Sequence, residues 1–248
     1  MNGIADIHCH IIPYVDDGAL RMEEAKELLA MQIEQGVGTI CCTPHLRHHM
    51  FETPDETIKE QFARLKEYCE QENLPVTLYL SREYHCDELL LKKLEAGEIL
   101  PLGNRNVLLT EFSHRHSEAQ MHKYIKIIKS YGFKPLIAHA ERYEALTEST
   151  GQIAELVELG ALIQMNASSI TGSEGRRQAS WCKKLLKERL IHVVASDAHD
   201  PEERPPELEE CAMIIEKKCG SEYAEKLLRT NPLTILESPN GGSGHARG

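Results

Sequence analysis

Hydrophobic and polar positions along the chain follow two alternating patterns. Short apolar runs rich in Val, Ile and Leu predict buried strands, and the longer stretches between them repeat with the period of an amphipathic helix. The seven predicted strands are residues 4–7, 37–42, 76–80, 107–110, 135–138, 161–165 and 191–195. The predicted helices are residues 22–35, 54–72, 87–96, 118–131, 150–159 and 174–189, with two more after residue 206.

Residues at the predicted helix ends support these boundaries. Gly36, Gly97, Gly132 and Gly160 each follow a predicted helix, where a left-handed backbone conformation favours glycine. Thr53 stands before a proline at the start of the second helix, and this order predicts Thr53 as the N-cap.

Regular alternation of strands and helices with short connections predicts a parallel sheet. Seven repeats without a long linker favour a closed or nearly closed α/β barrel over two domains. We therefore expect one domain over residues 1–237. Residues 238–248 contain Pro, Gly and Ser with little apolar content, so we expect them to form a flexible tail.

Composition excludes several classes of protein. The 248 residues include 28 Lys and Arg against 39 Asp and Glu, a net charge of −11, which disfavours nucleic acid as a partner. No apolar run approaches the roughly 20 residues of a membrane helix, and the first residues lack the features of a signal peptide. The eight cysteines include no Cys-x-x-Cys pair and are expected to be reduced thiols. We expect a cytoplasmic protein that does not insert into membranes.

Six of the seven predicted strands end in histidine or carboxylate side chains. In parallel α/β folds, functional residues collect at the carboxyl ends of the strands. His8 and His10 are two apart on a strand and leave on the same face, and Asp197 and His199 repeat that spacing. Such nitrogen and oxygen donors bind divalent metals. The nine candidate metal ligands are His8, His10, Asp17, His45, Glu83, Glu111, His139, Asp197 and His199.

The size of this set indicates more than one ion. A single catalytic zinc uses about three protein ligands, so nine candidates predict two or three ions with bridging carboxylates. Glu83 and Glu111 are the natural bridges. Because no thiolate is included, manganese, iron and zinc all suit the set.

Several motifs carry a resemblance to a known family. They are Asp6-Ile7-His8-Cys9-His10, Asp16-Asp17-Gly18, Thr43-Pro44-His45, Ile137-Ala138-His139-Ala140-Glu141-Arg142-Tyr143 and Ala195-Ser196-Asp197-Ala198-His199, followed by Arg204-Pro205-Pro206. Together they resemble the polymerase-and-histidinol-phosphatase (PHP) superfamily. Within it the chain is most similar to the capsule-type bacterial protein-tyrosine phosphatases, manganese-dependent enzymes that partner tyrosine autokinases in polysaccharide export. The resemblance spans residues 4–236.

The resemblance implies a distorted TIM-like (β/α)7 barrel of the PHP type that holds three Mn²⁺ ions. The implied ligand groups are His8, His10, Glu83 and Asp197 for the first ion, Glu83, Glu111 and His139 for the second, and Asp17, His45 and His199 for the third.

The implied activity is hydrolysis of phosphotyrosine, on a bacterial tyrosine autokinase that regulates capsular or exopolysaccharide synthesis. Attack by a hydroxide held between two ions would proceed without a covalent intermediate. The resemblance also implies that Arg142 and Arg204 bind the phosphate. His199, or a water on the third ion, is the candidate donor of a proton to the leaving group. Arg47 is a further candidate for binding the substrate.

The chain also departs from the family pattern. Arg82 precedes Glu83 where relatives usually have a small residue, so we expect a bulky cation near the site. The segment after Glu111 is rich in His and Arg, and His114 and His116 are expected at the surface or at the rim of the site.

Three other hypotheses are compatible with parts of the sequence. Cys41 and Arg47 have the Cys-x5-Arg spacing of thiol-based tyrosine phosphatases, but Pro44 removes a backbone N–H from the loop that would hold the phosphate. A second alternative is a PHP phosphatase acting on histidinol phosphate or another small phosphate monoester. A third is a non-catalytic module that binds a kinase. Loss of activity on substitution of Cys41 would favour the first.

Overall fold

A computed structural model describes residues 1, 3–103 and 106–237; residues 238–248, which were expected to form a tail, lie outside the described residues. All seven predicted strands are confirmed within one or two residues. They are β1 (Ile4–Cys9), β2 (Val37–Cys42), β4 (Thr77–Leu80), β6 (Val107–Glu111), β7 (Lys134–Ile137), β8 (Leu162–Asn166) and β9 (Val193–Ala195).

Two further strands were not predicted. They are β3 (His45–Leu46) and β5 (Glu83–His85), and each follows a break of two residues after a longer strand. The ladder continues across both breaks, because Ser81 N–H donates to Cys42 O at 2.9 Å and Glu83 N–H donates to Pro44 O at 3.1 Å. β3 and β5 therefore extend β2 and β4, and they present His45 and Glu83 side by side in a parallel pair.

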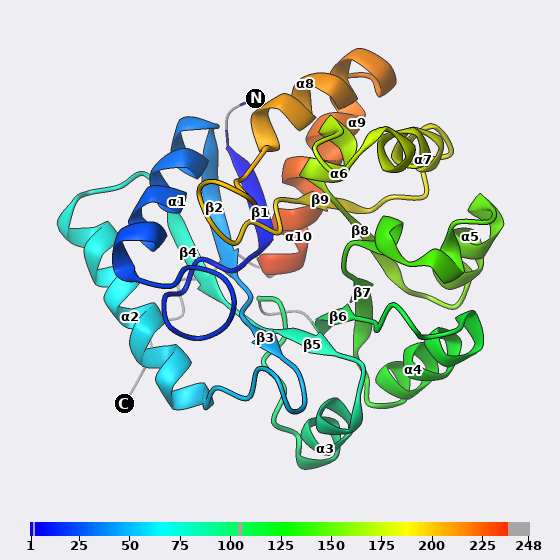
Figure 1. The fold of residues 1–248 in the computed structure, drawn as a ribbon, viewed down its shortest axis with the longest axis horizontal. Helices are drawn as coiled ribbons and strands as arrows, with labels where there is room; N and C mark the ends of the chain where they lie inside the picture. Colours follow the sequence, from blue (N-terminus) through cyan, green and yellow to red (C-terminus); the bar gives the residue numbers. More distant parts are fainter. Residues whose placement is uncertain (2, 104–105, 238–248) are drawn as a thin grey trace.

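The strands form two parallel sheets, in the orders β1-β2-β4 and β3-β5-β6-β7-β8-β9. A parallel bridge between Cys9 and Ala198 joins the end of the last strand to the first. If β3 and β5 are counted as continuations of β2 and β4, seven strands form a ring, and the helices surround it (Figure 1). This architecture confirms the predicted distorted (β/α)7 barrel, and the two strand breaks are its distortion.

The predicted helices are also present, with bounds that differ by up to two residues. They are α1 (Met22–Glu34), α2 (Asp55–Gln71), α3 (Glu88–Ala96), α4 (Glu118–Ser130), α5 (Thr150–Glu158), α7 (Arg176–Lys187) and α8 (Leu208–Cys219), followed by α9 (Ser221–Glu225), the π-helical η3 (Lys226–Thr230) and α10 (Asn231–Leu236). The short elements α6 (Ala167–Thr171), η1 (Ala140–Arg142) and η2 (Glu144–Leu146) were not predicted.

The residues predicted at the helix ends are mostly confirmed. All four glycines predicted at helix C-termini have φ between 69° and 96°. The prediction for Thr53 was wrong, because Pro54 is the N-cap of α2 and no side chain caps that end. The Thr53 hydroxyl instead donates to Val15 O at 2.6 Å and so ties the start of α2 to the loop after β1.

The interior of the ring is apolar at one end. Leu236 of α10 packs with Ile7, Cys41, Leu109 and Ala138, which come from different sides of the ring. In Figure 1, α10 lies under the middle of the ring. Because α10 closes the end at which the strands begin, the carboxyl ends of the strands are left for polar side chains.

Candidate metal centre

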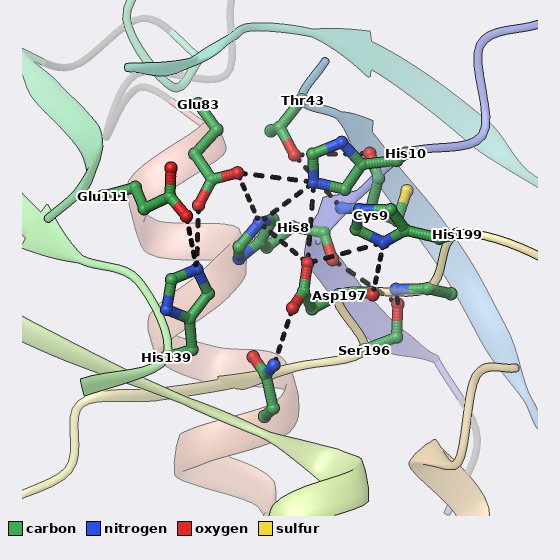
Figure 2. Close-up of polar contacts among 12 residues, drawn as sticks. His8, Cys9, His10, Thr43, Glu83, Glu111, His139, Ser196, Asp197 and His199 are labelled. Carbon is green, nitrogen blue, oxygen red and sulfur yellow. Dashed lines mark hydrogen bonds and ion pairs between the residues drawn. The ribbon is translucent and has the colours of Figure 1, made fainter. Parts of the chain in front are cut away.

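All nine candidate metal ligands lie at the carboxyl ends of the strands. Strands β1, β3, β5 and β6 carry His8, His45, Glu83 and Glu111, and the other five residues lie in the loops that follow β1, β7 and β9. Seven of the nine side chains are buried, whereas Glu111 is half-buried and Asp17 is exposed. Figure 2 shows seven of these residues directed toward one another.

The first group of ligand atoms surrounds the two histidines of β1 and its loop. The Nε2 atoms of His8 and His10 are 3.3 Å apart. Asp197 Oδ1 lies 3.3 Å from the first of these nitrogens and 3.5 Å from the second. Glu83 Oε2 lies 3.4 Å from each. Four side chains thus present one nitrogen or oxygen each to a common point.

The second group shares Glu83 with the first. Glu83 Oε1 lies 3.1 Å from His139 Nε2, and Glu111 Oε1 lies 3.8 Å from the same nitrogen. The two oxygens of Glu83 therefore face two different groups. This is the position that a bridging carboxylate requires.

The third group lies toward the surface. Asp17 Oδ1 is 3.4 Å from His45 Nε2 and 3.7 Å from His199 Nε2. One nitrogen or oxygen of each of these residues and of His10 lies within 4.8 Å of the others. The structure thus brings the nine residues close together. The groups overlap, because His10 belongs to both the first and the third, and His45 Nδ1 also lies 2.8 Å from Glu83 Oε2.

Two buried atoms of the site show that it fits cations. His199 Nε2 and Glu83 Oε2 have no hydrogen-bond partner among the described residues. The Glu83 oxygen lies 2.8 Å from His45 Nδ1, yet without hydrogen-bonding geometry. A buried lone pair without a donor costs free energy unless a cation or a proton compensates it. The donor set of imidazole and carboxylate suits divalent metals.

A chain of amides behind the first group fixes the orientation of His8. Its Nδ1 lies 3.0 Å from Gln164 Oε1. Gln164 Nε2 donates to Asn166 Oδ1 at 2.7 Å, and Asn166 Nδ2 donates to Asp197 Oδ2 at 2.7 Å. Because Gln164 offers an oxygen, His8 carries its proton on Nδ1 and leaves Nε2 free for a metal. Gln164 was not predicted, although its i, i+2 spacing from Asn166 on β8 was a usable signal.

Asp16 has the same role for His10. Its Oδ2 lies 2.8 Å from His10 Nδ1 and accepts the His45 N–H at 3.0 Å, while its Oδ1 accepts the Gly18 N–H at 3.0 Å. Burial alone would raise the pKa of Asp16, but the contacts with His10 and His45 lower it to about 2. A Cβ at Gly18 would lie 2.0 Å from His10 O, so this turn requires glycine.

His85 supports the candidate ligand Glu111 and was not predicted. Its Nδ1 lies 2.9 Å from Glu111 Oε2, so it supports the carboxylate from the side opposite His139. Glu83 and His85 have the i, i+2 spacing that places both side chains on one face of a strand. The same spacing identified His8 and His10, and it was overlooked in this strand.

The backbone is strained at two of the candidate ligands. His139 has φ of 33° and Asp197 has φ of 54°, and both lie in the left-handed region that residues with a Cβ rarely adopt. Asp6 holds the loop that contains Asp197, because its carboxylate accepts Ser196 Oγ–H at 2.5 Å and Ser196 N–H at 3.0 Å. Strain of this kind is typical of functional sites.

In the metal-free site, the carboxylates and imidazoles shift one another's pKa values. Burial alone would lower the pKa of His139, but Glu83 and its acidic neighbours raise the pKa to about 9. Burial would raise the pKa of Glu83, and the surrounding imidazoles hold it well below its ordinary value. His199 differs, because burial and then the neighbouring His10 hold its pKa well below the ordinary value.

The two candidate phosphate-binding arginines meet at the far oxygen of Asp197. Arg142 Nη1 donates to Asp197 Oδ2 at 2.9 Å, and Arg204 Nη2 donates to the same atom at 3.2 Å. Both arginines line a hollow of about 180 Å³, together with Ser196. The pair therefore lies next to the first group of candidate ligands.

Three other residues noted in the sequence make no hydrogen bond or ion pair to the candidate ligand atoms within the described part of the chain. The Arg82 guanidinium reaches the site only through the backbone of a candidate ligand, because it donates to His45 O at 2.6 Å and to Asp55 Oδ1 at 2.7 Å. Arg47 is half-exposed, and its guanidinium has no polar partner among the described residues. His116 accepts the Ser113 N–H within its own loop at 3.2 Å.

The structure argues against a thiol nucleophile at Cys41. The side chain is buried in the apolar interior of the ring. Burial, with neighbouring Cys42 and Asp6, raises the pKa of the Cys41 thiol well above its ordinary value. A reactive cysteine requires the opposite environment, with an accessible thiol and a lowered pKa.

Comparison with known proteins places the chain in a family. The model of the family "Capsular polysaccharide synthesis, CpsB/CapC" matches residues 4–237. The tyrosine-protein phosphatase CpsB of Streptococcus pneumoniae is 37% identical over 236 residues, which cover 93% of this chain and 97% of that protein. The tyrosine-protein phosphatase YwqE of Bacillus subtilis is 30% identical over 241 residues, with 94% of each chain covered.

Solved structures agree with this assignment. One from a study of YwqE from Bacillus subtilis and CpsB from Streptococcus pneumoniae, described as unique metal-dependent tyrosine phosphatases, has a TM-score of 0.86 at 29% identity and covers 94% of both chains. A phosphotriesterase homology protein from Escherichia coli has a TM-score of 0.61 at 10% identity, covers 95% of this chain and 99% of that one, and supports the barrel fold alone. None of the described helices is both long and apolar enough to span a membrane. The chain belongs to the CpsB/CapC family of capsular polysaccharide synthesis.

Proposed function

We propose that this protein is a metal-dependent tyrosine phosphatase that hydrolyses phosphotyrosine in a protein substrate. The observation that carries the proposal is the position of Asp197. Its Oδ1 faces the imidazoles of His8 and His10, and its Oδ2 accepts from Arg142 and Arg204. One carboxylate thereby joins a metal-binding group to a pair of permanent cations, the two parts that hydrolysis of a phosphate monoester requires.

Three divalent cations would occupy the three ligand groups, with Mn²⁺ as the expected metal and iron or zinc as alternatives that suit the same donors. His8, His10, Glu83 and Asp197 would hold the first, Glu83, Glu111 and His139 the second, and Asp17, His45 and His199 the third. When bound, such ions supply a nucleophile at neutral pH and offset the charge of the phosphoryl group.

The two arginines would bind oxygens of the phosphoryl group. A guanidinium remains charged at any physiological pH and donates in a planar fork that matches phosphate. Because both arginines already contact the ligand Asp197, a phosphate bound between them lies beside the first group. Arg47, which has no polar partner among the described residues, is a third candidate for binding the substrate.

His199 fits a ligand better than a proton donor. Its Nδ1 lies 2.9 Å from the backbone carbonyl of Asp197, so the proton is on Nδ1 and Nε2 carries a lone pair. The low pKa of the ring agrees with a neutral imidazole. A tyrosine leaving group has a conjugate acid with pKa of about 10, and it needs less assistance from an acid than an alkyl alcohol does.

The expected substrate is a phosphorylated bacterial tyrosine autokinase of capsular or exopolysaccharide synthesis, dephosphorylated in the cytoplasm. The names of the relatives and of the family support the phosphotyrosine substrate and the link to capsule synthesis. Eight free cysteines, seven of them buried, agree with a reducing compartment.

Substrate choice separates this proposal from a small-ester phosphatase. Protein loaded with Mn²⁺ should hydrolyse a phosphotyrosyl peptide faster than histidinol phosphate. Arg142→Ala and Arg204→Ala should each lower kcat/KM for the peptide by about 100-fold, because each removes a charged donor to the phosphoryl group. Faster turnover of histidinol phosphate would contradict the proposed substrate, and full activity of both variants would contradict the proposed phosphate site.

A further inference from the structure

A carboxylate that the sequence analysis did not consider holds Arg142. Glu174 lies in the segment between α6 and α7. Its Oε2 accepts from Arg142 Nε at 3.0 Å, and its Oε1 accepts from Arg142 Nη2. Two parallel hydrogen bonds of this kind form the strongest arginine–carboxylate contact. The arginine proposed to bind phosphate is therefore already paired through one edge.

Glu174 is itself held in place by its own segment. Ser168 Oγ–H donates to its Oε1 at 2.8 Å, and Gln178 Nε2 approaches its Oε2 at 3.5 Å. Gly172 and Gly175, with φ of 106° and 104°, turn the chain on either side of it. Although burial would raise the pKa of Glu174, the contact with Arg142 holds it below the ordinary value, so the group is ionised.

The donors of Arg142 can be counted. A guanidinium has five N–H groups. Glu174 takes one on Nε and one on Nη2, and Asp197 takes one on Nη1. Each terminal nitrogen therefore keeps one N–H that neither carboxylate uses. An arginine fixed at two edges has lost most of its conformational freedom before substrate binds.

We propose that Glu174 is a positioning residue, which fixes Arg142 through its Nε and Nη2 edge so that the remaining N–H groups of its terminal nitrogens are left to bind the phosphoryl group. This inference rests on the proposed function, because it takes Arg142 as a ligand of the phosphate. The carboxylate also offsets part of the charge of Arg142. Its benefit therefore lies in orientation during the reaction and not in affinity for phosphate.

The test compares Glu174→Gln with a matched control. Glutamine has nearly the same shape but offers one acceptor oxygen, so the fork contact is lost. Glu207→Gln is the control, because Glu207 lines the same hollow and accepts from the Ser173 hydroxyl at 2.8 Å, and it contacts no arginine among the described residues. For each Mn²⁺-loaded variant, kcat and KM on a phosphotyrosyl peptide and Ki for inorganic phosphate are measured, with metal content and Tm.

Glu174→Gln should lower kcat by about 10- to 100-fold, because a misplaced catalytic donor costs this much, while Ki for phosphate stays the same or falls. Ser168→Ala, which removes one hydrogen bond to Glu174, should lower kcat by a smaller factor. If Glu174→Gln is unstable, this milder variant still tests the proposal. Glu207→Gln should keep kcat within about twofold. An unchanged kcat in Glu174→Gln would overturn the proposal. A rise in kcat/KM with a lower Ki would also overturn it, since Glu174 would then only compete with the substrate.

A double-mutant cycle tests whether Glu174 acts through Arg142. In an Arg142→Ala background, Glu174→Gln should cause no further loss of kcat. An equal loss in both backgrounds would overturn the proposal and assign Glu174 a structural role. The failure of the proposed function has a different signature, because Arg142→Ala alone would then leave hydrolysis unchanged.

Discussion

Single residues behind the metal ligands determine which ring nitrogen of each histidine is free. Gln164 and Asp16 contact the Nδ1 atoms of His8 and His10, and the backbone carbonyl of Asp197 contacts Nδ1 of His199. In each case Nε2 is left for a cation. Partners of this kind orient the ligands and raise their basicity.

Asp16→Asn should therefore weaken metal binding without removing a ligand. The variant keeps an oxygen for Gly18 N–H but places an amide N–H₂ against the Nδ1–H of His10 and the N–H of His45. We expect the affinity for Mn²⁺ to fall by about 10- to 100-fold, as measured by titration of the metal-stripped protein. Glu67→Gln is the control, because Glu67 is exposed on α2, contacts Gln71 at 3.1 Å and lies in none of the candidate metal groups among the described residues. Equal affinities in the two variants would contradict the assigned role of Asp16.

Substitution of Cys41, in contrast, should leave the activity unchanged. Because its thiol is buried in the apolar interior of the ring, Cys41→Ala should leave kcat/KM of the Mn²⁺-loaded enzyme within about twofold, at a stability cost of about 1 kcal/mol for a small buried side chain. Steady-state kinetics with a phosphotyrosyl peptide checks this. Loss of turnover at unchanged metal content would restore the thiol mechanism.

The sequence predicted the candidate ligands better than their supports. All nine ligands follow predicted strands, where the residue type alone indicates a metal. Asp16 was noted only as part of a motif, and Gln164, His85 and Glu174 were not predicted. Such residues act through contacts between segments distant in sequence, such as the pair Arg142 and Glu174, and no local pattern reports these contacts.

At the scale of secondary-structure elements, the broken strands are the main difference from the prediction. β3 and β5 have two and three residues, too few for a period of two to be recognised. Pro44 marks the first break because it lacks an N–H. These extensions carry His45 and Glu83, so the distortion of the barrel and the formation of the site have a common origin.

Arg82 stabilises this broken region. Its guanidinium connects the break before β5 to the start of α2 and to β3, through Asp55 Oδ1, Thr53 O and His45 O. The Arg82 side chain is 2% exposed, whereas Asp55 is 34% exposed. Arg82→Ala should lower the free energy of unfolding by about 3 kcal/mol, the low end for a broken buried pair because solvent partly screens Asp55.

Denaturant unfolding of the Mn²⁺-loaded protein measures this loss. Lys93→Ala is the control, since Lys93 contacts the other oxygen of Asp55 at 3.4 Å from a more exposed position, and its loss should cost less than about 1 kcal/mol. If the two substitutions cost the same, Arg82 does not have the assigned role.

At the scale of the whole molecule, the closed ring concentrates acidic and imidazole groups that only a cation or protons can balance. His139 has a pKa of about 9 in the folded, metal-free chain against an ordinary value of 6.5. The raised pKa contributes stability that is fully present below about pH 6.5 and is lost as the pH rises through about 9. We therefore expect the metal-free protein to lose stability over this interval.

Unfolding by denaturant in EDTA at several pH values between 6.5 and 9 checks this expectation. In His139→Gln, the free energy of unfolding should depend less steeply on pH. The comparison removes the contribution of the cysteines, which are common to both proteins. The Mn²⁺-loaded protein should lack this contribution of His139, because a metal-bound imidazole carries no proton on Nε2. If the free energy of unfolding depends on pH equally in the metal-free wild type and in the variant, His139 does not carry the assigned proton.

Whether bound metal drives hydrolysis is tested by titrating metal-stripped protein with Mn²⁺ while bound metal and phosphotyrosyl-peptide hydrolysis are followed together. We expect no turnover without metal, turnover that rises as up to three ions bind, and loss of both turnover and the first ion in a His8→Ala/His10→Ala variant. Turnover that persists in EDTA and is unchanged in that variant would contradict this expectation.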